Sequence, residues 1–77
     1  MNVSILISLI MAKIQLNGSK LELKKKYSIF ALLKKYKVDG KKAAVELNGK
    51  IINRNKHKSV YIKNKDKIEI VHFIGGG

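Results

Sequence analysis

Two short runs of alternating apolar and polar residues open the regular part of the chain. They span residues 13–16 and 19–23, and an Asn-Gly pair separates them at 17–18. This pair favours a type I′ turn, because both central residues of that turn need positive φ angles. A two-residue turn then pairs Ile14 with Leu21 on the inner face of a predicted β-hairpin. The other predicted pairs are Leu16 with Ser19, Gln15 with Lys20, and Lys13 with Glu22.

The next apolar positions follow a helical period. Four residues with the spacing i, i+3, i+4, i+7 predict one apolar stripe of an amphipathic helix. The stripe comprises Ile29, Leu32, Leu33 and Tyr36. Because Tyr36 lies on this stripe, we expect it to pack in the core. Ser28 suits the N-cap, and the lysines at 34, 35 and 37 suit the negative C-terminal end of the helix dipole. We expect Gly40 to end the helix.

The second half of the chain consists of short strand-like runs between polar turns. Residues 43–47 and 50–53 flank a second Asn-Gly pair, which predicts another hairpin. Residues 60–62 predict a brief extended piece, and residues 68–74 predict the last strand. This order predicts an α+β roll, with a mixed but mostly antiparallel sheet packed on one helix. The period alone leaves open which strands are neighbours.

Side-chain alternation in the last strand separates a core face from an outer face. If Ile68 and Ile70 face the core, Val71 and Phe73 lie outside, directly before the chain end. Two exposed apolar side chains at this point would form a docking patch. We therefore assign partner docking to Val71, Phe73 and Ile74. The alternative is that a bulge, a covering loop or the N-terminal segment buries them.

His72 falls on the core side of this alternation. No other titratable group is placed beside it by the pattern. We therefore predict a partly buried residue at a strand end rather than a ligand or a base.

Residues 1–11 are mostly apolar and carry no charged side chain. A membrane-spanning helix needs about 20 apolar residues, and a secretory signal needs a cationic start, so neither is expected. Three interpretations of this segment stay open. It is an extension ahead of a natural start at Met11, it lengthens the first strand, or it covers an apolar patch. We divide the chain into an extension, 1–11, and a single domain, 12–77, with a free, flexible tail at 75–77.

Length and composition narrow the classes of function. A chain of 77 residues has room for one core and little room for an enclosed active site. It has no cysteine, which excludes disulfides, thiolate metal sites and a persulfide on this chain. The two histidines and five carboxylates are scattered along the sequence. We therefore expect no catalytic residues, no metal site and no enzyme.

The formal charge of +12 comes almost entirely from lysine, and Arg54 is the single arginine. Such a charge suits nucleic acid, an anionic membrane or an acidic protein. Nucleic-acid readers favour arginine, and abundant Lys, Ile and Asn is what an AT-rich genome favours. We therefore expect a solvated surface, with no nucleic acid and no membrane as partner. A basic nucleic-acid-binding domain, with Tyr27 and Tyr61 stacking on bases, stays as an alternative.

The three glycines at 75–77 follow an apolar strand at the end of the chain. Glycine has the greatest backbone freedom and buries nothing, so these residues do not serve the fold. A tail without side chains fits a narrow channel and ends in an unhindered carboxylate. That carboxylate can attack the α-phosphorus of ATP to give an acyl adenylate, which a sulfur nucleophile can displace. A merely disordered chain end is the simpler alternative.

Five segments resemble one known family. They are residues 14–18, 28–33, 45–49, Arg54, and 66–77, of which the last is the most specific. From about Lys13 to Gly77 the sequence is similar to the sulfur-carrier family of thiamine biosynthesis (ThiS), a branch of the ubiquitin-like β-grasp proteins. Molybdopterin-type carriers also end in Gly-Gly, but they usually reach it through a proline-containing segment, and this chain has no proline. Residues 1–11 and the high charge depart from the family pattern.

The resemblance implies a cytoplasmic carrier that binds no cofactor itself. A partner adenylyltransferase would activate the Gly77 carboxylate with ATP and magnesium, and a sulfur donor would turn it into a thiocarboxylate. Gly75 and Gly76 would thread into the partner's active site. Thiazole synthase would then take the sulfur to build the thiazole ring. A ubiquitin-like protein modifier or a molybdopterin-type carrier would use the same carboxylate, and both stay as alternatives.

Overall fold

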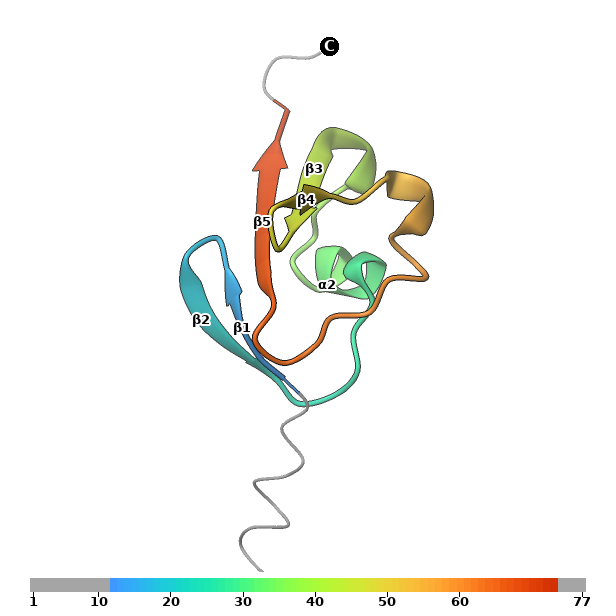
Figure 1. Ribbon diagram of the computed structural model, residues 1–77. Coiled ribbons are helices and arrows are strands. Elements are labelled where there is room, and N and C mark those ends of the chain that lie inside the picture. The colour runs from blue at the N-terminus through green and yellow to red at the C-terminus, as the bar shows by residue number, and fades with distance from the viewer. Residues whose placement is uncertain (1–11, 74–77) are drawn as a thin grey trace, which may run out of the picture.

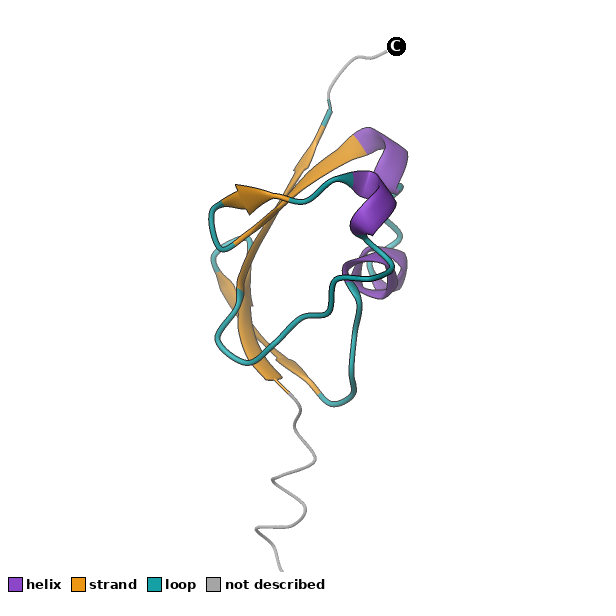
Figure 2. Cartoon of the chain, turned by 45° about the vertical axis from the view of Figure 1, so that its right-hand side comes forward, coloured by secondary structure: helices purple, strands orange, loops and turns teal. Residues whose placement is uncertain are grey.

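A curved, mixed five-stranded sheet wraps around one α-helix in the computed structural model (Figure 1, Figure 2). The structure describes residues 12–73, so the predictions for the N-terminal extension and for the glycine tail lie outside the described residues. The strands are β1 (Ala12–Leu16), β2 (Ser19–Leu23), β3 (Ala43–Leu47), β4 (Lys50–Ile51) and β5 (Lys67–His72). The helix α2 spans Ile29–Lys35, and two 3₁₀ turns, η1 and η2, span Gly40–Lys42 and Arg54–Lys56.

The strands lie in the order β2-β1-β5-β3-β4, so the last strand of the chain is the middle strand of the sheet. Strand β5 runs parallel to β1 and antiparallel to β3. The two hairpin pairs, β1 with β2 and β3 with β4, are antiparallel. This arrangement confirms the predicted α+β roll with a mixed, mostly antiparallel sheet on one helix.

The first hairpin has the predicted register, with Ile14 opposite Leu21 and Lys13 opposite Glu22. Its turn residues Asn17 and Gly18 have φ angles of 48° and 81°, as a type I′ turn requires. The second hairpin uses the same chemistry, since Asn48 has a φ angle of 53°. Its return strand β4 is only two residues long.

The core lies between α2 and the inner face of the sheet. Ile29, Leu32 and Leu33 of the helix are buried there. The strands add Ala12, Ile14, Leu23, Val45 and Ile68, and Ile62 completes the cluster. The hydroxyl of Ser28 accepts a hydrogen bond from the backbone N–H of Ala31, which confirms the predicted N-cap.

The helix ends earlier than predicted. Lys37 adopts a φ angle of 58°, and Val38 donates a backbone hydrogen bond to the carbonyl of Leu33 at 2.8 Å. These contacts form a Schellman motif that turns the chain away from the helix axis. Tyr36 therefore sits at the C-cap and is exposed, which corrects the prediction that it packs in the core. Gly40 begins η1 and does not end the helix.

The segment 60–62 is not a regular strand. It makes one isolated bridge, between Ser28 and Tyr61, and a backbone hydrogen bond of 2.9 Å from Ile62 to the carbonyl of Tyr27. These contacts tie the segment to the chain just before α2. The side chain of Ile62 is buried in the core.

Candidate functional site

The C-terminal end of β5 leads directly into the glycine tail and is held firmly by its neighbours (Figure 1). Five residue pairs connect β5 to β3, from Ala43 opposite His72 to Leu47 opposite Ile68. The backbone N–H of Phe73 donates to the carbonyl of Lys42 at 2.8 Å. The hydrogen bonding between β5 and the segment that contains β3 thus continues as far as Phe73, the last described residue.

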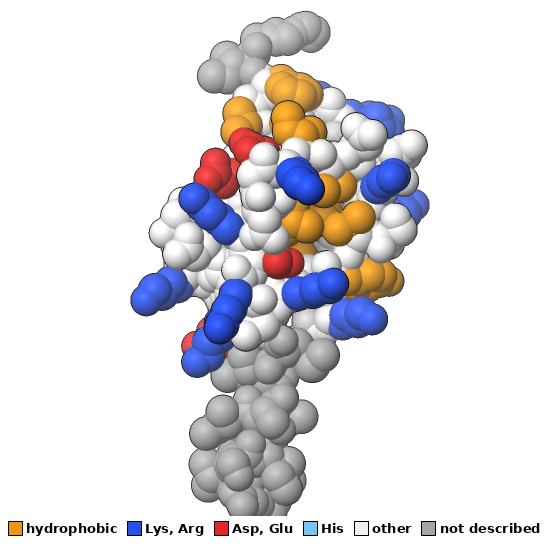
Figure 3. Space-filling view, in the orientation of Figure 1, with side chains coloured by type: hydrophobic (Ala, Val, Ile, Leu, Met, Phe, Trp, Pro, Cys, Tyr) orange, Lys and Arg blue, Asp and Glu red, His pale blue; other side chains and the backbone are white. Residues whose placement is uncertain are grey.

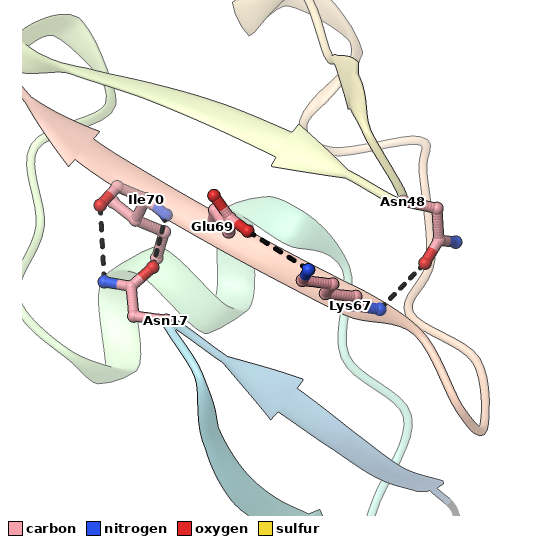
Figure 4. Close-up of polar contacts among 5 residues, drawn as sticks. All are labelled: Asn17, Asn48, Lys67, Glu69 and Ile70. Carbon is pink, nitrogen blue, oxygen red and sulfur yellow. Dashed lines mark hydrogen bonds and ion pairs between the residues drawn. The ribbon is translucent and has the colours of Figure 1, made fainter.

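Two asparagine side chains bind the backbone of β5 at the points where β1 and β3 end (Figure 4). Asn17 Oδ1 accepts a hydrogen bond from the N–H of Ile70 at 2.7 Å, and Asn17 Nδ2 donates to the carbonyl of Ile70 at 3.3 Å. Asn48 Oδ1 accepts from the N–H of Lys67 at 2.8 Å. Each hairpin turn therefore also fixes the strand that precedes the tail. Beyond the turn itself, no sequence pattern indicates this role.

Apolar side chains gather on the outer face of the sheet near the C-terminal end of β5 (Figure 3). Val71 is 55% exposed, Phe73 is 62% exposed, and Ile51 of β4 is 69% exposed. Val71 lies opposite Ala44, and Ile51 lies opposite Glu46. We call Ala44, Ile51, Val71 and Phe73 the outer-face patch.

The predicted exposure of Val71 and Phe73 is confirmed, because Ile68 is fully buried and Ile70 packs against the core. Their role in docking stays a prediction. Ile74, the third predicted docking residue, lies outside the described residues, and so do Gly75, Gly76 and Gly77.

The predicted partial burial of His72 is wrong, because its side chain is exposed, whereas its predicted position at a strand end is confirmed. Its predicted place on the core side of the strand is confirmed, since it lies opposite the buried Ala43. Burial declines along β5, however, from Ile68 to the partly buried Ile70 and then to His72, so the core ends before the last residue of the strand.

His57 is the buried histidine instead, with 3% of its surface exposed. Its Nε2 lies 3.2 Å from the carbonyl oxygen of Ile52. It comes from a polar stretch with no apolar period, so the sequence offered no sign of its burial.

Residues 12–73 contain no group of three or more His, Cys, Asp or Glu side chains that could hold a metal ion. Within the same range, the ion pair that forms is Lys67 with Glu69 at 3.6 Å, with both side chains exposed. No helix in this part of the chain is long and apolar enough to cross a membrane. The described residues thus offer a firmly held strand, β5, with an apolar surface beside its C-terminal end.

Comparison with known proteins gives one consistent result. The model of the ThiS family matches residues 10–77, so the match includes the terminal glycines. The sulfur carrier protein ThiS of Bacillus subtilis (strain 168) is 42% identical over 65 residues, which cover 83% of this chain and 98% of that protein. A protein named thiazole synthase from Paramagnetospirillum magneticum is 38% identical over 65 residues, which cover 84% of this chain and 20% of that protein.

A solved structure supports the same conclusion. The crystal structure of the thiamine biosynthesis protein (ThiS) from Geobacter metallireducens matches with a TM-score of 0.73 and 28% sequence identity. The match covers 84% of this chain and 99% of that chain. Sequence and fold agree over nearly the same residues, and the chain therefore belongs to the ThiS family.

Proposed function

We propose that this chain carries sulfur for thiamine biosynthesis as a thiocarboxylate on Gly77. The observation that carries the proposal is the family match, which runs through the last strand and the terminal glycines to residue 77. In the structure, the strand that leads to these glycines is the central strand of the sheet. A domain of this kind presents the chain end, and partner enzymes supply the catalytic groups.

The proposed chemistry has two balanced steps. A carboxylate oxygen of Gly77 attacks the α-phosphorus of ATP, and pyrophosphate leaves, which gives an acyl adenylate. A hydrosulfide-class nucleophile then attacks the carbonyl carbon, AMP leaves and one proton is released, which gives the thiocarboxylate. An adenylyltransferase that uses ATP and magnesium would catalyse the first step, and a separate sulfur donor would supply the nucleophile.

Thiazole synthase is the proposed sulfur acceptor. The Paramagnetospirillum magneticum protein of that name contains a stretch similar to this chain within a much longer sequence. Joining a carrier to its acceptor raises the effective concentration of one beside the other. We infer that this chain serves a separate thiazole synthase in the same way, without the covalent connection.

The outer-face patch is the proposed docking surface for these partners. Val71 and Phe73 project from a strand that is hydrogen-bonded along its length, so a partner that binds them also fixes the start of the tail. Gly77 lies four residues after Phe73. An extended chain spans at most about 3.3–3.6 Å per residue, so the carboxylate reaches about 14 Å beyond the patch. The partner's reactive centre is expected within that distance.

Intact-mass measurement tests the proposal directly. The full chain is incubated with ATP, magnesium, sulfide and a ThiS-type adenylyltransferase, with a chain lacking Gly77 as the control. We expect a mass gain equal to the replacement of one oxygen by sulfur, in the full chain alone. An unchanged mass, with an adenylyltransferase that is active on its own carrier, would refute the proposed sulfur chemistry. An amide bond to a lysine of another protein would instead identify a protein modifier.

A further inference from the structure

A groove lies on the helix side of the molecule, between α2, η1 and η2, away from the outer face of the sheet. Its volume is about 730 Å³. Phe30, Leu33 and Val38 form its apolar walls, and Gly40 and His57 also line it. Small-molecule sites typically have volumes of about 300–1,000 Å³ and combine apolar walls with a few polar groups. We call this site the basic groove because of the charges around it.

Four cationic side chains line the basic groove, namely Lys34, Lys41, Arg54 and Lys58. Asp39 is the one acidic residue in its lining, and its Oδ1 accepts a hydrogen bond from the backbone N–H of Lys41 at 2.8 Å. Among residues 12–73, no carboxylate lies within ion-pair distance of these four cations. Like charges around a concave site concentrate positive potential there and attract an anion.

Phe30 positions two of these cations in advance. The Lys58 ammonium lies 4.8 Å from the centre of the Phe30 ring, and the Lys34 ammonium lies 6.0 Å from it. A lysine held against an aromatic face by a cation–π contact has less freedom to lose when it binds a ligand. The groove thus contains partly ordered ammonium groups, which suit phosphate oxygens.

His57 supplies a different kind of polar group. A carbonyl oxygen only accepts hydrogen bonds, so Nε2, the nitrogen that faces Ile52 O, carries a proton, and in the neutral imidazole Nδ1 is an acceptor. Within the described part of the chain, no donor is hydrogen-bonded to Nδ1. A methyl group added at Gly40 would lie 3.6 Å from Nδ1, at ordinary van der Waals contact, so the gap between this nitrogen and the backbone of η1 is about the size of one small group. No buried side-chain nitrogen or oxygen among residues 12–73 lacks a hydrogen-bond partner, so the unpartnered Nδ1 is accessible to solvent, and His57 lines the groove from which a ligand can reach it.

We propose that the basic groove binds a small phosphorylated molecule that also carries a hydroxyl group. The phosphate contacts the cations at Lys34, Arg54 and Lys58, and the hydroxyl donates to Nδ1 of His57. The groove shares η1 with the base of the tail, because Lys41 lines the groove and the next residue, Lys42, accepts the backbone hydrogen bond from Phe73. A bound ligand therefore lies against the same turn that holds the end of β5.

An NMR titration of the full ¹⁵N-labelled chain at constant ionic strength tests this site. The probes are ribose 5-phosphate, inorganic phosphate and unphosphorylated ribose. We expect saturable shifts at Gly40, Lys41 and Lys58, with ribose 5-phosphate binding up to about tenfold more tightly than phosphate, since one hydrogen bond contributes up to about that factor. Ribose alone should not saturate. Adenosine monophosphate distinguishes two classes of ligand. If it binds more tightly than ribose 5-phosphate, the groove is assigned to nucleotides. If it binds more weakly, the groove is assigned to sugar phosphates.

Matched variants locate the contacts. Gly40→Ala fills the space in front of Nδ1 at ordinary contact distances, so the fold is kept and ribose 5-phosphate should bind only as weakly as phosphate. Arg54→Gln should weaken both phosphorylated probes. Lys20→Gln, on the edge strand β2 away from the groove, should change neither. Equal affinity for ribose 5-phosphate and phosphate, shifts spread over lysines of both faces, or unchanged binding in Gly40→Ala and Arg54→Gln would overturn the proposal.

Discussion

Asn17→Gly removes a single side chain from the tip of the first hairpin and leaves the turn able to keep its shape. Asn17 has a φ angle of 48°, which glycine adopts without steric strain. The substitution therefore breaks the two hydrogen bonds between the Asn17 side chain and the backbone of Ile70, at 2.7 and 3.3 Å. It tests whether the turn fixes β5 or only closes the hairpin.

The size of the effect follows from these two bonds. A typical intramolecular hydrogen bond contributes about 0.5–1.5 kcal/mol net, so two contribute about 1–3 kcal/mol. Both bonds lie near the surface, where water takes over part of their role, so we expect about 1–2 kcal/mol. In a domain of this size, about 1 kcal/mol shifts the melting temperature by about 4–8 °C. The expected decrease in melting temperature is therefore about 5–15 °C.

Lys65→Gly is the matched control, because it makes the same change to glycine at another positive φ angle, 72°. The backbone hydrogen bond from Lys65 to the carbonyl of Lys13 remains in that variant. Glycine relieves the strain of the left-handed conformation but also gives the unfolded chain more freedom. These two effects offset each other, so little change in the melting temperature is expected. Circular dichroism melts of wild type and both variants give the comparison. An Asn17→Gly melting temperature within about 2 °C of that of Lys65→Gly would refute the proposed role of Asn17 in holding β5.

Three further substitutions examine the core, the patch and the surface charges. Ile68→Ala, at a fully buried side chain, should lower the free energy of unfolding by about 2–5 kcal/mol in urea titrations, and a smaller loss would show that the core closes around the cavity. Phe73→Glu should weaken binding to the adenylyltransferase in calorimetry while the melting temperature stays nearly unchanged; a large loss of stability would argue that Phe73 packs within the domain. Glu69→Gln should change the free energy of unfolding by less than about 0.5 kcal/mol in urea titrations, because its ion pair with Lys67 is exposed. A larger change would show that the pair contributes more than its exposure suggests.

Local chemistry explains why the hairpins and the helix start could be predicted. Asn17-Gly18 selects the turn and therefore the register of the first hairpin, and Ser28 caps the first turn of α2 through its own hydroxyl. Neither depends on distant parts of the chain. The outward position of Val71 and Phe73 followed in the same way from strict alternation in one strand.

Interactions between distant segments explain what the sequence did not reveal. The position of β5 between β1 and β3, and the binding of its backbone by Asn17 and Asn48, depend on how the hairpins pack against one another. Tyr36 was misplaced because Lys37 takes a positive φ angle that lysine rarely adopts. The burial of His57, likewise, depends on the surrounding fold.

The central position of β5 also has a mechanical consequence. A partner that drew the tail into a channel, as proposed, would apply force along β5, which is paired with β1 on one side and with β3 on the other. Under such a load the strand must slide past both neighbours, so several hydrogen bonds have to break together. An edge strand could instead be peeled away one bond at a time. The domain is therefore expected to remain folded under such a load.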